Sequence, residues 1–105
     1  MSMWNIEDFN GYTPITTFWQ DFSIADAFGI DAVKDTFKRA FDECKSDYKY
    51  PTELSLVLNW KSWEHNDKSN YELSRLYVEL WEQVDNYAYD NLNEEEKRYY
   101  WEKTD

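Results

Sequence analysis

Side chains that could carry out chemistry are few in this 105-residue chain, which contains one histidine, His65, and one cysteine, Cys44. A nucleophile needs a base within reach, and a two-metal centre in a helical bundle needs Glu-x-x-His pairs on two helices. Glu79 and Glu82 stand three residues apart, but no second histidine accompanies them. The two glycines cannot form a phosphate-binding loop. The sequence therefore predicts no catalytic residue, no metal site, no cofactor and a non-enzymatic function.

Carboxylates dominate the chain, with 22 Asp and Glu against 11 Lys and Arg, for a net charge of −11. Such a chain repels nucleic acid and anionic membranes, so neither is expected as a direct partner. It is attracted instead to basic protein surfaces, many of which exist to bind nucleic acid. The alternative is that the acidity serves solubility alone.

A row of carboxylates is expected on one side of a long amphipathic helix at about residues 69–92. Leucines, tyrosines, Trp81 and Val84 recur there at spacings of three and four, which predicts an apolar stripe on the other side. The acidic side and the first turn of the next helix form the candidate partner-binding surface: Glu72, Glu79, Glu82, Asp85, Asp90, Glu94 and Glu95. Acids on one helical side stand roughly 5–10 Å apart, which brackets a phosphate repeat of roughly 7 Å along a nucleic-acid strand.

The remaining helices are placed by capping signals, which predict an all-α fold of four to five helices packed on the long one. Five residues are expected to precede helices as N-caps: Thr17, Asp31, Thr52, Ser69 and Asn93. Gly29 should follow the first helix in a left-handed conformation, and Tyr50-Pro51 should end the second, whose apolar stripe reaches Tyr48.

One domain is expected to span residues 1–105. Residues 1–15 lack a helical period and contain Gly11 and Pro14, which predicts an irregular arm. The helical bundle should then comprise residues 16–105.

Aromatic residues make up 20% of the chain, and two of them suggest a second kind of contact. The helix after Thr52 carries apolar residues on two sides, with Trp60 and Trp63 on one of them. Such a helix is either central to the bundle or half of an interface, and the central position is preferred. If these tryptophans form an exposed patch, they could bind a partner or a second copy of the chain as a homodimer.

Cys44 lies within the apolar stripe of the second helix and is interpreted as a small buried hydrophobic residue. A single cysteine forms no intramolecular disulfide, which fits a reducing compartment. No segment is apolar enough for a transmembrane helix or a signal peptide. The expected location is the cytoplasm of a bacterial host cell.

Three segments resemble short proteins encoded on bacterial mobile elements and phages: TTFWQDFSIADAFGIDAVKDTFKRAF, YPTELSLVLNWKSWEH and LYVELWEQVDNYA. The resemblance covers residues 16–105, and that group carries no catalytic motif to transfer. By analogy of size, charge and setting, it implies an anti-CRISPR or antirestriction inhibitor that mimics DNA.

The sequence thus favours a non-catalytic acidic protein that blocks a basic, nucleic-acid-binding surface of another protein, such as a CRISPR nuclease or a restriction enzyme. The alternative is a small helical interaction protein whose aromatic residues make the contact.

Overall fold

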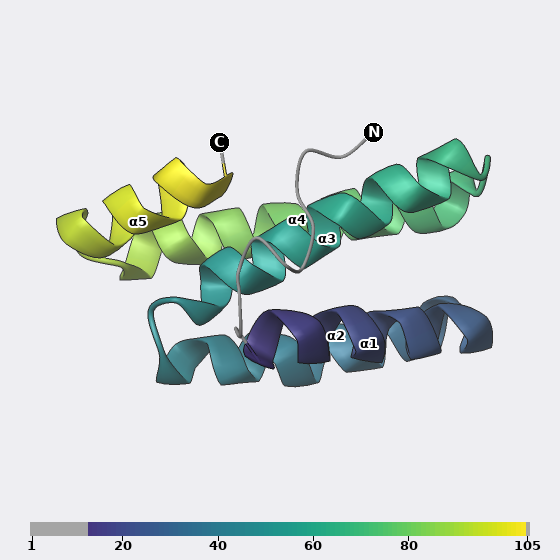
Figure 1. The fold of residues 1–105 in the computed structure, drawn as a ribbon, viewed down its shortest axis with the longest axis horizontal. Coiled ribbons are helices and arrows are strands. Elements are labelled where there is room, and N and C mark those ends of the chain that lie inside the picture. The colour runs from purple at the N-terminus through teal and green to yellow at the C-terminus, as the bar shows by residue number, and fades with distance from the viewer. Residues whose placement is uncertain (1–12, 105) are drawn as a thin grey trace.

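The computed structural model describes the backbone of residues 13–104 and the side chains of residues 17–104. Within residues 13–104, five α-helices and one short 3-10 helix follow one another (Figure 1): α1 (Thr13–Phe28), α2 (Ile30–Glu43), η2 (Cys44–Ser46), α3 (Tyr50–Asp67), α4 (Tyr71–Asn91) and α5 (Glu94–Thr104). The prediction of an all-α fold of four to five helices is confirmed.

The N-terminal boundary differs from the prediction. Helix α1 begins at Thr13, four residues before the expected cap Thr17, so residues 13–15 are helical and do not belong to an arm. Pro14 is compatible with this start because the first N–H groups of a helix have no partner within it. Residues 1–12, the rest of the expected arm, lie outside the described part of the chain.

Helix α3 is the centre of the molecule, as its two apolar sides predict. It contacts α1, α2, α4 and α5, and twelve of its 18 residues are buried. Figure 1 shows α1 and α2 as one layer and α3 and α4 as a second, with α5 at the end of the second layer. The long helix α4 is therefore a covering helix that packs mainly on α3.

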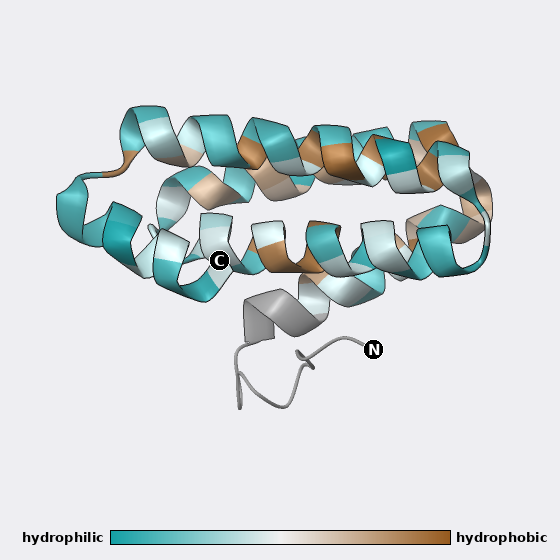
Figure 2. Cartoon of the chain, turned by 90° about the horizontal axis from the view of Figure 1, so that it is seen from above, coloured by the Kyte–Doolittle hydropathy of each residue, from teal (hydrophilic) through white to brown (hydrophobic). Residues whose placement is uncertain are grey.

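Helix α4 buries the stripe that its sequence predicts. Its buried residues are Leu73, Leu76, Tyr77, Leu80, Val84 and Ala88. Most of its remaining residues are hydrophilic, as are most residues of α5 (Figure 2), although Tyr71 and Tyr89 are exposed on α4. Because only one side of α4 is covered, its opposite side is available to solvent or to a partner.

Gly29 alone separates α1 from α2. Its φ of 108° lies in the region that favours glycine, as predicted, and its N–H donates to the Ala25 carbonyl at 3.1 Å. The Gly29 carbonyl in turn accepts the Val33 N–H at 3.1 Å and starts α2. Gly29 therefore precedes α2, and the prediction that Asp31 caps this helix was wrong, since Asp31 lies in its first turn.

Two further capping predictions were wrong and one is confirmed. Thr52 lies fully buried inside α3, because Pro51 starts this helix instead of ending α2, which stops at Glu43. Ser69 is not the N-cap of α4, because Asn70 holds that position. Ser69 lies in the preceding turn with a φ of 60°. At α5, the Asn93 side chain accepts the Glu96 N–H at 2.9 Å, and the Glu96 carboxylate accepts the Asn93 N–H at 3.1 Å. This reciprocal pair is a capping box.

The apolar stripe of α2 is shorter than predicted. It ends at the buried Cys44 in η2, whereas Tyr48 lies in the following turn and is exposed. The predicted stripe assumed one continuous helix, but the chain turns at residues 47–49 to reach α3.

Candidate functional site

The predicted acidic surface is largely exposed. Six of the seven carboxylates proposed from the sequence are exposed on α4 and at the start of α5: Glu72, Glu79, Glu82, Asp90, Glu94 and Glu95. We call these six residues the acidic row. The helical rise of 1.5 Å per residue places Glu72 and Asp90 roughly 27 Å apart along α4.

The acidic row is not neutralised by neighbouring cations. Within residues 17–104, the ion pairs involve Asp26, Asp42 and Glu64 as the acidic partners and no member of the row. Lys97, the first cation of α5, lies over the Tyr89 ring at 4.9 Å from its centroid. The row therefore carries net negative charge along α4, in which Arg75 is the single cation.

Asp85 does not belong to the exposed surface, contrary to the prediction. Its carboxylate is half-buried and accepts a hydrogen bond from the Tyr100 hydroxyl, which also lies 3.2 Å from the Ser55 hydroxyl. Burial raises the pKa of the Asp85 carboxyl and Glu82 adds to this, while the hydrogen bond from Tyr100 opposes it. Asp85 thus holds α5 against α4 and α3 instead of facing a partner.

Trp60 and Trp63 do not form the exposed patch that the sequence left open as the alternative to a central helix. Trp60 is 8% exposed and packs edge-on against Trp19 of α1, with ring centroids 6.2 Å apart. Trp63, one turn later, is 61% exposed. Because α1 covers Trp60 but leaves Trp63 uncovered, only Trp63 of these two tryptophans is exposed enough to contact a partner.

A buried polar cluster, which the sequence did not predict, joins α1, α3 and α4. The Asp26 carboxylate of α1 is its centre. One oxygen accepts the Lys61 ammonium and lies 2.9 Å from His65 Nε2, while the other accepts the Tyr77 hydroxyl at 2.5 Å. Lys61 also donates to Glu64 at 2.9 Å. We call these five residues the Asp26 cluster.

His65 is held by both of its ring nitrogens. Its ring stacks on Tyr77 with centroids 5.6 Å apart and planes within 5° of parallel. The Asn70 amide lies 3.4 Å from Nδ1, and the Asp26 carboxylate lies 2.9 Å from Nε2. His65 therefore packs against Tyr77 of α4 and also links α3 to α1 through its polar contact with Asp26.

Asp26, Glu64 and His65 also have the composition of a metal site. Their ligand atoms lie within 4.8 Å of one another. However, the Lys61 ammonium stands 2.9 Å from both carboxylates, and its side chain is 3% exposed. A lysine cation therefore already occupies the position between the carboxylates, and a metal ion would have to displace it.

Signals for this cluster were only partly present in the sequence. Lys61 and His65 fall on an apolar side of α3, where a buried lysine requires an acidic partner. That partner comes from α1, 35 positions earlier, and helical periodicity within α3 carries no information about it. The cluster therefore depends on how α1 packs against α3, which helical periodicity does not predict.

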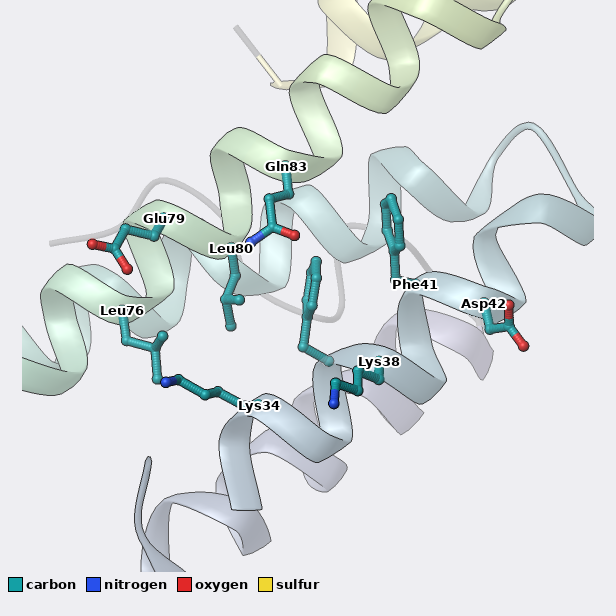
Figure 3. A pocket seen from close by; sticks show the side chains of 9 residues that line it. Lys34, Lys38, Phe41, Asp42, Leu76, Glu79, Leu80 and Gln83 are labelled. Carbon is teal, nitrogen blue, oxygen red and sulfur yellow. The ribbon is translucent and has the colours of Figure 1, made fainter. Parts of the chain in front are cut away.

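A groove of about 360 Å³ opens between α2 and α4, next to the acidic row. It is lined by Lys34, Phe37, Lys38, Phe41, Asp42, Leu76, Glu79, Leu80 and Gln83. Figure 3 shows the lysines rising from α2 and Glu79 and Gln83 from α4, on opposite sides of the apolar residues. Sequence periodicity predicted the two helix faces but not the gap between them.

No protein-family model, curated protein or solved structure matches this chain. Of the described helices, none is both long enough and apolar enough to cross a membrane. The fold and the surface together define a small, acidic, all-α protein.

Proposed function

We propose that this chain is a non-catalytic binding protein that covers a basic, nucleic-acid-binding surface of another protein. The observation that carries this proposal is the acidic row, whose exposed carboxylates have no ion-pair partner among the described residues. Helix α4 is held rigidly by its buried stripe, so the row is presented in a fixed arrangement.

Electrostatics support this function in two ways. A rigid row of like charges attracts a basic surface over a distance, which raises the rate of association. The row also extends over roughly 27 Å, about the rise of eight base pairs at 3.4 Å each, so one helix could compete for a nucleic-acid groove. We further propose, from the resemblance to proteins of bacterial mobile elements that the sequence suggests, a Cas nuclease or a restriction enzyme as the first partner to test.

The proposal is tested by competition for DNA. Cas nucleases and restriction enzymes are incubated with labelled DNA and increasing amounts of this protein, at two salt concentrations. Displacement of DNA that weakens steeply at higher salt supports the proposal, because screening shortens the reach of surface charges. A panel of such enzymes that keeps its DNA at every concentration of the protein contradicts it.

Charge reversal then assigns the contact to α4. The variant Glu72→Lys/Glu82→Lys/Asp90→Lys should lose the competition. A matched control, Asp21→Lys/Asp35→Lys/Glu43→Lys, changes the net charge equally at exposed residues of α1 and α2. Equal losses for the two variants would show that net charge matters and the acidic row does not.

A second candidate function, a helical interaction protein with an aromatic contact, is favoured by one observation. Trp63 is a large apolar side chain that is 61% exposed on α3. If it is the contact, Trp63→Ala should abolish partner binding or self-association at unchanged thermal stability. Binding should then depend weakly on salt, which distinguishes this function from the electrostatic one.

A further inference from the structure

We propose that the groove between α2 and α4 is an anchoring site for a protein segment that presents an aromatic side chain flanked by one basic and one acidic residue. This inference rests on the proposed function, because it describes the part of the partner that would dock beside the acidic row.

The floor of the groove is apolar and preformed. Phe37 of α2 and Leu76 and Leu80 of α4 form it, and each is less than 8% exposed, so the surrounding core fixes their positions. Phe41 stacks on Phe37 with centroids 5.3 Å apart and continues this wall. The groove has a volume of about 360 Å³, which lies in the range of small-molecule sites and is large enough for one aromatic ring.

The two rims carry opposite charges. Lys34 and Lys38, one turn apart on α2, line one side, whereas Glu79 and Gln83 line the α4 side (Figure 3). Asp42, also on the α2 side, is paired with Lys45 at 3.6 Å, which leaves the lysines as the dominant charge there. The groove is therefore complementary to a segment that places its own acidic residue beside α2 and its own basic residue beside α4.

Glu79 connects the groove to the acidic row because it belongs to both. Exposed charges set the rate and orientation of association, whereas a buried aromatic side chain in a fitted pocket supplies much of the affinity. The arrangement also discriminates between partners. A uniformly basic segment would meet Lys34 and Lys38, and a uniformly acidic one would meet Glu79.

Short peptides test the anchor without knowledge of the partner. The probes are acetylated, amidated tripeptides: Lys-Trp-Glu, Lys-Ala-Glu, Lys-Trp-Lys and Glu-Trp-Glu, titrated into the full chain labelled with 15N. We expect Lys-Trp-Glu to shift the amide signals of the groove residues. Its Kd should be lower by about fivefold or more than those of the other three, as expected for one desolvated ring and matched charges. Shifts spread evenly over the surface, or equal Kd values for Lys-Trp-Glu and Lys-Ala-Glu, would overturn the proposal.

Two variants locate the site. Gln83→Trp should fill the groove and abolish the Lys-Trp-Glu shifts, whereas Asn86→Trp, an exposed residue on the same helix that does not line the groove, should leave them unchanged. Lys34→Glu, an exposed substitution, should weaken the preference for Lys-Trp-Glu over Lys-Trp-Lys, because only Lys38 then remains as a cation on the α2 side. Equal effects of Gln83→Trp and Asn86→Trp, or an unaltered preference in Lys34→Glu, would contradict the assignment.

These outcomes are separate from those of the proposed function. The charge-reversal variant changes Glu72, Glu82 and Asp90, none of which lines the groove. If the protein binds the peptide but does not compete with DNA, the anchoring site is supported and the proposed function is contradicted. If it competes with DNA but does not bind the peptide, the proposed function is supported and the anchoring site is contradicted.

Discussion

Lys61 and Asp26 form a nearly enclosed ion pair between the central helix and α1, with Nζ 2.9 Å from Oδ2 and side chains that are 3% and 13% exposed. The ammonium also lies over the Trp19 ring, 4.5 Å from its centroid. Both charged groups have lost most of their contact with water and depend on each other. Removing one of them should therefore destabilise the protein by more than the net stabilisation that the pair provides.

Lys61→Met should therefore destabilise the protein by about 3–5 kcal/mol, because it keeps the aliphatic stem but leaves the Asp26 carboxylate without its cation. Urea unfolding measures this cost. Lys45→Met removes the exposed pair with Asp42, whose side chains are 57% and 79% exposed, and should cost at most about 1 kcal/mol. A double variant with Asp26→Asn should cost less than the sum of the two single variants. Similar costs for Lys61→Met and Lys45→Met would contradict the assignment.

Asp85 should make stability fall as pH rises. Burial raises its pKa above the ordinary 3.8 in the folded protein, so between the two values the folded state binds more protons than the unfolded state. The free energy of unfolding decreases with pH over that window, and the full cost is present above the pKa of the folded state. Asp85→Asn keeps an acceptor for Tyr100 and should be more stable than the wild type at neutral pH.

This difference should disappear below about pH 3, where the wild-type carboxyl is protonated in both states. Denaturant unfolding at several pH values is the measurement, with the exposed Asp90→Asn on the same helix as control. A stabilisation that persists at low pH would show that titration is not its cause.

The acidic row should lower stability at low ionic strength. Its carboxylates repel one another, so salt should raise the unfolding midpoint between about 0.01 M and 0.15 M, where the Debye length falls from about 30 Å to 8 Å. The variant Glu72→Lys/Glu82→Lys/Asp90→Lys brings the net charge from −11 to −5 and should show a smaller salt effect. Unfolding of this variant at low salt would mean that these side chains support the fold.

Cys44 should be unreactive in the folded protein. Its side chain is buried, and burial, with smaller contributions from Glu43 and Glu53, raises the pKa of the thiol to about 12. Thiolate is the reactive form, so labelling by a disulfide reagent at about pH 8 should be slow and should become fast in urea. Rapid labelling without denaturant would show that the η2 segment opens readily.

Much of the fold could be predicted because it depends on local sequence. The spacing of Leu73, Leu76, Leu80 and Val84 identified the buried side of α4, and the two apolar sides of α3 identified the central helix. The Asn93 capping box was predictable because both of its partners lie within one turn.

Features that depend on packing could not be predicted in this way. In the sequence, Asp85 cannot be distinguished from the exposed acidic residues around it. It is partly buried because α5 packs back against α4 and places Tyr100 next to it. Thr52 resembles a cap, but the preceding Pro51 itself occupies the first turn of α3 and moves the helix start to Tyr50. Trp60 and Trp63 differ in exposure only because α1 covers one of them.

The Asp26 cluster has a kinetic consequence. Its contacts to Lys61, His65 and Tyr77 span 35, 39 and 51 positions, so each requires the closure of a long loop. The pairing of α3 with α4 needs only the short connection at residues 68–70. We therefore expect the helical pair to form early and the cluster late, with φ-values near zero at Asp26. Substitution of Asp26 would then speed unfolding and leave the folding rate almost unchanged, so its carboxylate controls the lifetime of the native state.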